Sequence, residues 1–572
     1  MKLVKSLLLG SAAGLTAVAG AQAADLPVKK AVAVEYVRVC TAYGAGFFYI
    51  PGTDTCLRVT GFAQAAYQYT FTRGPRPDLT GYRTMGRIAL DARTDTAYGT
   101  LRTFIRMDMR NGSGSYLHSG TAVRMATAFT GTGVDTAGRL QTYVELDKAF
   151  IQFAGFTAGR AASFFDFYAA ANEIIGASFG SNVSATNLLA YTATFGGGFS
   201  ATISVEDPTW RRQPIYTPFN AIGGQTGATI GALPGIGTVV GGGFTGLFGN
   251  GAVLSGGGVA AVTPVPIAFD AAGNPAAYQL LDIAQRNRMP DFVGNLRLDQ
   301  PWGSAQLSVA THEIFTGAYQ PGIFSTGFVP GPVAALGGAV AGAANTAITG
   351  VDPARTFNKV PDAKYGYAIQ GGLKINLPMI AAGHVLYLQA AYAKGALRYT
   401  CVHCWNGSEA VSIPIGGRFN VNSNDAVVGP GGSLHLSDSW SALASFKHFW
   451  SPTWSSAITV SVGEINYPGI ARAGGPANLA FFPAFTATQF NALAFNATLK
   501  DAFLWQVAAN LNWTPVRGLD IGVEAVYTKA RLTGLTADAS RFGTSGAVLG
   551  VPLAVTRDDE HFMSRLRIQR EF

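Results

Sequence analysis

Alternation of apolar and polar residues with a period of two restricts the fold of this chain more than any other feature of its sequence. Within residues 57–71, one face of the predicted strand carries Leu57, Val59, Gly61, Ala63, Ala65, Tyr67, Tyr69 and Phe71. The opposite face carries Arg58, Thr60, Gln64, Gln68 and Thr70. We expect lipid beside the first face and water beside the second, because a strand presents alternate residues to opposite sides.

Two further segments continue the pattern and place arginine on the polar face. Residues 83–93 set Ile88, Leu90 and Ala92 against Arg87, Asp91 and Arg93. Residues 100–110 set Leu101, Ile105, Met107 and Met109 against Arg102, Arg106, Asp108 and Arg110. A soluble sandwich also alternates, but it would carry far less arginine on a shielded face and would not place Tyr and Phe at strand ends so regularly.

Thirteen more segments follow the same pattern, so that the sequence predicts sixteen strands. They lie near 143–153, 156–160, 188–195, 199–205, 291–299, 303–312, 364–376, 384–395, 439–450, 454–465, 501–513, 518–529 and 561–572. No segment offers about 18 continuous apolar residues free of glycine, so membrane-spanning helices are not expected. In a membrane, such a chain must close its sheet into a barrel to satisfy its backbone, and an even strand number is typical of bacterial barrels.

The composition favours a sheet between lipid and water over a set of soluble domains. The 572 residues include 71 glycines, 11% aromatic residues and only 13% charged residues. A soluble chain of this length would be expected to form several domains of roughly 150 residues. The formal net charge is +8, but the cations are scattered singly along strands, which argues against a nucleic-acid surface.

Short and long connections alternate along the chain. The short ones are residues 95–99, 154–155, 196–198, 300–302, 378–383, 451–453 and 514–518. The others lie around 72–82, 111–142, 161–187, 206–290, 313–363, 396–438, 466–500 and 530–560, and most of them are much longer. We therefore expect tight turns on a periplasmic rim and long loops on an external rim.

Both ends of the chain carry features typical of export to an outer membrane. Two lysines precede a weakly apolar stretch, and Ala21-Gln22-Ala23 then predicts cleavage of a signal peptide formed by residues 1–23. The last predicted strand ends in Phe572, on the face shared by Leu566 and Ile568. A terminal Phe on such a strand is the usual signal for the outer-membrane assembly machinery.

The four cysteines form two close pairs, Cys40 with Cys56 and Cys401 with Cys404. In an exported protein this spacing predicts two disulfides, each closing a short loop. A redox motif or half of a zinc site remains an alternative for Cys401-Val-His-Cys404, although no second cysteine or histidine cluster accompanies it. No cofactor and no metal site are expected.

Two stretches of the sequence are long enough to compare with known families. The first is residues 39–56 (VCTAYGAGFFYIPGTDTC), and the second is residues 149–156 (AFIQFAGF), followed by Gly159-Arg160 and by 163–167 (SFFDF). The first resembles the opening signature of the alphaproteobacterial porins, the family that includes the major porins of Brucella and rhizobia, and the second resembles the strand that leads into the third loop of that family. The likeness runs from the mature N-terminus to about residue 205 and from about residue 290 to the end.

The resemblance implies a sixteen-stranded trimeric porin of the outer membrane, an antiparallel β-barrel whose third external loop folds into the lumen. On this reading, residues 24–55 form a periplasmic N-terminal segment and residues 56–572 form the barrel. The constriction loop is 161–187, and 206–290 is a long Gly-rich external loop. The implied function is a passive, water-filled channel for small hydrophilic solutes and ions. The sequence departs from the family at 213–280 and 328–349, nearly uncharged stretches that are compatible with capping the pore, packing on other subunits or contacting lipopolysaccharide.

Fixed charge at a narrow place determines what such a channel admits, because charges at a rim are screened within about 8–10 Å. We expect the constriction to consist of Arg87, Arg102 and Arg106 on the wall, opposed by Asp166 and Glu173 on the inward loop. Asp91, Arg93, Asp108 and Arg110 are expected to line the pore wall beside them. The arginines are alternatively interpreted as pairing with Asp91 and Asp108 to stiffen a polar wall. Net charge alone does not determine ion preference, since loops and rims contribute to it without touching the pore.

Three other functions remain as alternatives. A barrel enzyme is disfavoured, since the seven histidines are isolated and none has a suggestive serine or aspartate context. A barrel that serves as a scaffold for surface binding or adhesion is compatible with the uncharged long loops. A substrate-specific outer-membrane channel is the strongest rival, and preferential uptake of one solute over others of equal size would favour it.

Overall fold

The computed structural model describes residues 38–71, 79–114, 141–183, 185–213, 288–316, 362–402, 433–469, 500–537 and 555–572, with shorter stretches between 215 and 282 and between 412 and 428. The predicted signal peptide, Cys404, all of 328–349 and most of 213–280 lie outside the described residues. Within the described part, no helix is both long and apolar enough to cross a membrane.

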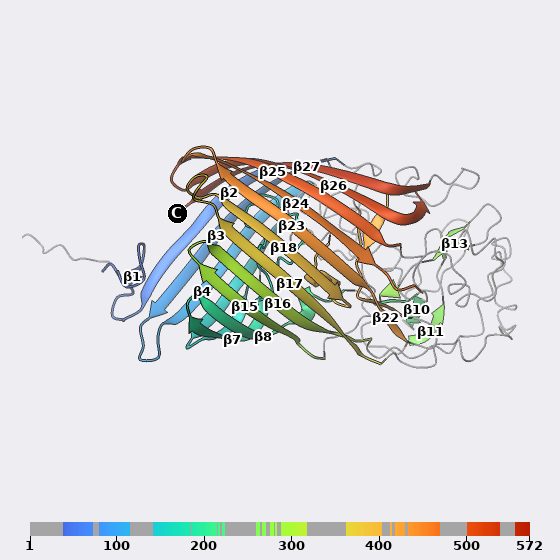
Figure 1. The fold of residues 1–572 in the computed structure, drawn as a ribbon, viewed down its shortest axis with the longest axis horizontal. Coiled ribbons are helices and arrows are strands. Elements are labelled where there is room, and N and C mark those ends of the chain that lie inside the picture. The colour runs from blue at the N-terminus through green and yellow to red at the C-terminus, as the bar shows by residue number, and fades with distance from the viewer. Residues whose placement is uncertain are drawn as a thin grey trace, which may run out of the picture.

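Sixteen antiparallel strands of the described chain form one closed barrel (Figure 1). In order around the barrel they are β2 (Cys56–Phe71), β3 (Thr80–Thr94), β4 (Leu101–Gly114), β5 (Gln141–Phe153), β6 (Phe156–Ala161), β7 (Thr186–Gly196), β8 (Phe199–Glu206), β15 (Asp291–Gln300), β16 (Gly303–Ile314), β17 (Lys364–Asn376), β18 (Val385–Lys394), β23 (Asp438–Phe449), β24 (Trp454–Asn466), β25 (Ala502–Val516), β26 (Leu519–Ala537) and β27 (Val555–Glu571). The first and last of these strands pair, with Ala65 opposite Ile568, so the sheet has no open edge.

Each of the sixteen predicted strands is present at its predicted place, which confirms the expected fold class. The largest difference is the last hairpin, where β26 continues to Ala537 and β27 begins at Val555. The pairing of these two strands shifts register between Arg531 and Thr536, and such an irregularity interrupts the alternation from which strands are predicted. A further short strand, β1 (Phe48–Tyr49), pairs with the start of β2.

The outer face of the barrel is apolar and carries aromatic residues near both ends of the strands. Near the short turns, the exposed aromatic side chains include Tyr98, Phe156, Tyr191, Phe195, Phe199, Trp302, Trp450, Trp454, Trp513 and Phe572. Toward the long connections they are Tyr69, Phe71, Tyr82, Phe292, Tyr365, Tyr367, Phe503 and Phe562. Exposed aliphatic residues such as Ile203 and Leu296 lie between the two groups. Two aromatic girdles around an apolar band are the outer surface that a lipid bilayer requires.

The strand ends that short turns join lie at one end of the barrel, and the strand ends that long connections join lie at the other end, as predicted. The link between β7 and β8 consists of Gly197 and Gly198, which both have positive φ (57° and 79°). A Cβ atom at Gly198 would lie 1.9 Å from the carbonyl oxygen of Asp299, so only glycine fits this tight turn. In Figure 1 the C-terminus and β1 lie at the short-turn end, and the short strands β10 (Asn220–Gly223), β11 (Val259–Thr263) and β22 (Leu434–Leu436) lie at the other.

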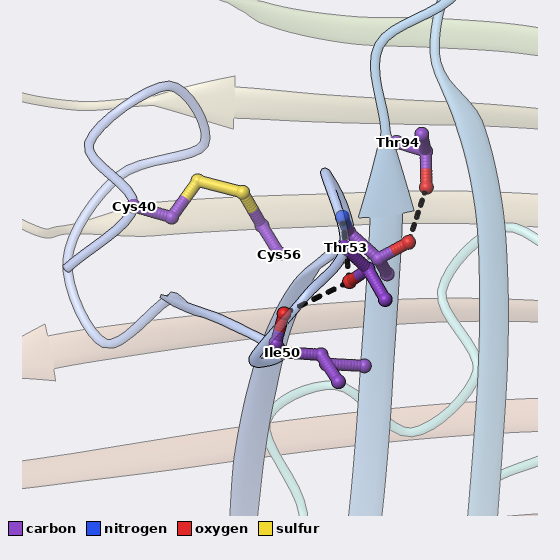
Figure 2. Close-up of a disulfide and its surroundings, with 6 residues drawn as sticks. Cys40, Ile50, Thr53, Cys56 and Thr94 are labelled. Carbon is purple, nitrogen blue, oxygen red and sulfur yellow. Dashed lines mark hydrogen bonds between the residues drawn. A yellow bond between two sulfur atoms is a disulfide. The ribbon is translucent and has the colours of Figure 1, made fainter. Parts of the chain in front are cut away.

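The N-terminal segment that precedes β2 is tied to the barrel by a disulfide between Cys40 and Cys56, one of the two bonds predicted from the sequence (Figure 2). Both cysteines are buried together with Phe47. A hydrogen bond from Thr53 Oγ1 to the carbonyl oxygen of Ile50 (3.0 Å) holds the turn beside the disulfide. Because Cys404 lies outside the described residues, the second disulfide stays a prediction.

Candidate functional site

The inward loop, which we define as residues 162–185 without 184, crosses the interior of the barrel. It leaves β6 and returns at β7, yet its contacts are with strands on the far side. Tyr168 donates its hydroxyl to Ser445 Oγ on β23 (2.9 Å), and the backbone N–H of Phe179 donates to Ser461 Oγ on β24 (3.1 Å). The N–H of Ile174 donates to Glu524 on β26 (3.1 Å). The third loop therefore folds into the lumen, as expected.

Amide side chains on the inner faces of β15, β17, β18 and β25 form hydrogen bonds with further backbone groups of the inward loop. Asn295 Nδ2 donates to the carbonyl oxygen of Phe164 (2.7 Å), and Gln370 Nε2 donates to that of Phe165 (2.8 Å). Gln389 Oε1 accepts the N–H of Tyr168 (3.0 Å), and Asn510 Nδ2 donates to the carbonyl oxygen of Asn172 (2.7 Å). A loop inside a barrel has little water to bond to, so this set of amide side chains replaces water as its partner.

Asp166 holds the two ends of the inward loop together. Its carboxylate forms an ion pair with Arg211 (3.0 Å) and accepts hydrogen bonds from the Ser181 hydroxyl and from the N–H of Val183 (2.5 Å). The guanidinium of Arg211 also stacks over the ring of Tyr399 at 4.1 Å. Asp166 and Arg211 are both nearly inaccessible to solvent. A buried pair of this kind fixes geometry, and its charges compensate each other rather than act on a passing solute.

The wall opposite the inward loop consists of arginines that share buried carboxylates across β3, β4 and β5. Arg87 binds both oxygens of Asp108 (2.7 and 2.8 Å), and Arg110 binds the same carboxylate at 2.8 Å. Arg110 also lies 3.2 Å from Glu145, and Arg106 forms an ion pair with Asp147. Bidentate pairing keeps these planar groups in fixed positions along the wall.

Asp147 reaches the lumen because of a bulge in β5. The pairing of β4 with β5 shifts between Arg106 and Met107, which leaves Asp147 without a cross-strand partner. Before the bulge, Val144 (69% exposed) and Leu146 (49%) point outward, and after it Ile151 (51%) does. The bulge therefore changes which residues of β5 face inward, from odd to even numbers, and places Asp147 and Lys148 side by side.

A second arginine group lies nearer the short-turn end. Arg93 and Arg102 flank the buried carboxylate of Asp91 at 2.8 and 2.9 Å. The guanidinium of Arg102 lies over Phe104 (5.2 Å) and Phe150 (5.5 Å). Planar stacking and ion pairing together hold this arginine against the wall.

A cavity of about 780 Å³ lies between the wall and the inward loop. Among the predicted site residues, Arg87, Arg106, Arg110 and Glu173 line it. The described residues that line it do not include Arg102, Asp166, Asp91, Arg93 or Asp108. The structure thus brings Arg87 and Arg106 opposite Glu173, while Arg102 and Asp166 lie in the separate ion-pair groups described above.

The face that the inward loop turns to this cavity carries little charge. It consists mainly of Ala169, Ala170, Ile174, Gly176 and Val183. Glu173 is the one carboxylate that the loop contributes to the lining in the described part of the chain. Burial, reinforced by the nearby carboxylate of Glu524, raises the pKa of Glu173 to about 7, so this group is only partly ionised at neutral pH.

Sequence reasoning missed several residues that line the cavity, among them Arg58, Arg83, Asp147 and Arg567. Arg58, Arg83 and Arg567 occupy lumen-facing positions of β2, β3 and β27. Their inward orientation could therefore have been predicted from the alternation of polar and apolar residues. Asp147 could not be found in this way, because its inward position depends on the bulge. Within the described residues, no group of three histidine, cysteine, aspartate or glutamate side chains has the arrangement of a metal site.

The amino-acid sequence of the chain matches a known protein family over most of its length. Residues 25–549 match a family model described as a porin subfamily. Among curated relatives, porin Omp2a of Brucella ovis is 40% identical over 208 residues, which is 36% of this chain and 59% of the relative. Porin Omp2b of Brucella abortus is 40% identical over 210 residues, or 36% of this chain and 54% of the relative. The chain therefore spans a little more than half the length of these relatives.

Solved structures to which the chain shows a limited similarity include an outer-membrane channel. The channel DcaP of Acinetobacter baumannii has a TM-score of 0.44 and 12% identity, over 92% of this chain and 99% of that protein. OmpF of Salmonella typhi, in complex with daunomycin, has a TM-score of 0.38 and 10% identity, over 91% of this chain and 98% of that protein.

Proposed function

Because the chain belongs to the porin subfamily, we propose that it forms a passive, water-filled channel for small hydrophilic solutes and ions across the bacterial outer membrane. The observation that carries this proposal is the charged cavity inside a closed barrel with an apolar outer face. A polar interior of this kind is useful to a membrane barrel only if water and solutes occupy it.

The proposed constriction lies between Arg87 and Arg106 on the wall and residues 169–176 of the inward loop. Its support is that both arginines and the loop line the same cavity. We extend the proposal to Arg102 and to Asp91, Arg93, Asp108 and Arg110 as groups of the pore wall. Their ion pairs hold the neighbouring guanidinium groups in place along β3 and β4. Asp166 is proposed to act on the constriction indirectly, by fixing the inward loop through Arg211.

The expected assembly is a homotrimer in contact with outer-membrane lipid and lipopolysaccharide. The support for the trimer is the sequence resemblance to the alphaproteobacterial porins. Phe572 is proposed as the assembly signal, because it extends the pairing of β27 with β2 through two hydrogen bonds with Gly61. We propose no cofactor and no enzymatic activity, since passive diffusion requires neither.

Swelling of liposomes that contain the purified full-length protein tests the proposal. Neutral sugars of increasing size should enter at rates that fall smoothly with molecular size, because a water-filled pore selects by diameter. Uptake of one sugar well above others of equal size would replace the general channel with a substrate-specific one. Folded protein that admits no sugar would contradict the channel and favour a barrel that serves as a binding scaffold.

A further inference from the structure

The charges that line the cavity are strongly unbalanced. Six arginines of the barrel wall line it, and we call them the basic wall: Arg58, Arg83, Arg87, Arg106, Arg110 and Arg567. Arg398, from the segment that follows β18, adds a further guanidinium. On the described residues of the barrel wall, the lining contains three acidic side chains, Glu145, Asp147 and Glu571. Asp108 lies behind the lining and binds Arg87 and Arg110, so six guanidinium groups of the wall face four carboxylates, and cationic groups still outnumber anionic ones.

The two acidic side chains nearest the centre of the basic wall are already occupied by arginines. Glu145 lies 3.2 Å from Arg110 and 3.9 Å from Arg160. Asp147 pairs with Arg106 and lies 3.9 Å from Arg87. Each carboxylate therefore sits between two guanidinium groups, so it reduces the local positive charge without reversing it. Glu571 is farther along β27, at the short-turn end, and accepts a hydrogen bond from Gln569 (2.8 Å).

The inward loop does not add enough negative charge to the cavity to offset the positive charge of the basic wall. The carboxylate of Asp166 is turned toward Arg211 and away from the cavity. Glu173 is the loop's one acidic side chain in the described lining, and its raised pKa of about 7 reduces its average charge at neutral pH. The other described residues of the loop that line the cavity are uncharged, so they do not oppose the positive charge of the basic wall; they are Ala169, Ala170, Ile174, Gly176, Asn182, Val183 and Ala185.

We infer that the cavity is a selectivity filter for anions, and that small anionic solutes carrying carboxylate or phosphate groups cross it in preference to cations of similar size. The inference rests on the proposed channel function and adds the class of solute to it. Guanidinium groups in fixed positions raise the local concentration of anions, and low-dielectric walls strengthen their field. Arginine also binds carboxylate and phosphate in a bidentate manner, which favours these groups over chloride.

The test is the reversal potential of purified full-length protein in a planar bilayer under a KCl gradient. We expect the reversal potential to have the sign that results when chloride permeates faster than potassium. Arg58→Gln combined with Arg83→Gln should shift the reversal potential toward zero. Arg58 is a suitable position because Asp91 keeps Arg93 and Arg102 when Arg58 is removed, and one partner of Arg83 is the neutral amide of Gln64 (2.9 Å). Arg531→Gln, on the outer face of β26, is the matched control and should leave the potential unchanged.

A second pair of variants introduces the missing acidic group. Ala169 is exposed, lines the cavity and has a φ of 45°, which lies in the left-handed region that aspartate and asparagine adopt more readily than most residues. The reversal potential of Ala169→Asp should lie closer to the value for potassium permeation than the reversal potential of Ala169→Asn does. The difference between these two variants isolates charge from size, since the two side chains have nearly the same shape.

The outcomes separate the filter from the channel itself. Steady conductance with a potassium preference in the unmodified protein would overturn the anion filter and leave the channel standing. An anion preference that survives both the arginine and the aspartate substitutions would place selectivity elsewhere and also overturn the inference. Absence of conductance in correctly folded protein would instead contradict the proposed channel. Phosphate added to one side should reduce chloride current in the unmodified protein more than in the double arginine variant.

Discussion

Asp108 is fully buried between Arg87 and Arg110, and Asp91 occupies the same kind of position between Arg93 and Arg102. Loss of either aspartate would leave two arginines close together, whereas loss of one arginine would leave the carboxylate a second partner. Removing one partner of a buried ion pair commonly costs about 3–5 kcal/mol when no other partner remains. Because each carboxylate is shared, a single arginine substitution should leave the protein folded. The effect of such a variant on ion flow can then be measured separately from its effect on stability.

Glu173 gives the protein a pH dependence that we predict from its environment. Its pKa rises from 4.5 to about 7 in the folded protein, so the folded state binds its proton more tightly than the unfolded state does. The stability that this group contributes is present below about pH 4.5 and is lost as the pH rises through 7. The loss is at most about 3.5 kcal/mol, because the pKa rises by about 2.5 and each pKa unit corresponds to about 1.4 kcal/mol.

Glu173→Gln should remove this part of the pH dependence. Thermal unfolding of the detergent-solubilised protein between pH 5 and pH 8, followed by circular dichroism, measures it. The unmodified protein should lose stability over this range more steeply than the variant. Parallel profiles for the two proteins would contradict the assigned burial of Glu173.

At the scale of single residues, the sequence predicted side chains well wherever alternation was regular. Arg87, Arg106 and Arg110 line the cavity on the predicted phase of β3 and β4. Asp147 was missed because a bulge reverses the phase within β5. The position of Asp166 depends on Arg211, which is 45 residues away in the sequence. Tertiary pairing of this kind leaves no periodic signal in the chain.

At the scale of elements, the strands and short turns could be predicted because each depends on local chemistry. Alternation marks a strand between lipid and water, and glycine pairs such as Gly197-Gly198 mark tight turns. The path of the inward loop could be anticipated only from family resemblance. Its partners are amide, hydroxyl and carboxylate side chains on eight strands from β15 to β26, which are distant in sequence.

Packing of the inward loop against β17 leads to a prediction for two neighbouring glycines. A Cβ atom at Gly372 would lie 2.3 Å from the ring of Phe167, whereas a Cβ atom at Gly371 would meet no atom within 4 Å. Gly372→Ala should therefore displace Phe167 and loosen the inward loop. We expect larger current fluctuations in single-channel recordings of this variant.

Gly371→Ala is the matched control, since it adds the same methyl group to the outer face of the same strand. Its recordings should match those of the unmodified protein. If both alanine variants behave like the unmodified protein, Phe167 does not hold the loop in place. If both are equally noisy, the effect comes from the strand rather than from the loop.

At the scale of the whole molecule, the chain divides the barrel interior between a packed part and an open part. The inward loop fills the side of β15 to β26, and the cavity remains beside β2, β3, β4, β5 and β27. Closure of the sheet and the apolar outer face were predictable from strand number and alternation. The size and place of the cavity were not, because they depend on how the inward loop packs across the lumen.

The most direct test of the channel is single-channel conductance after one side chain is enlarged on each face of β2. Thr60 lines the cavity, and its neighbour Val59 is exposed on the outer face. Thr60→Trp should lower the conductance because the indole occupies part of the path, while Val59→Trp should leave it unchanged because that side chain faces lipid. Equal conductance in Thr60→Trp and Val59→Trp, with both proteins folded, would contradict a permeation path between the basic wall and the inward loop.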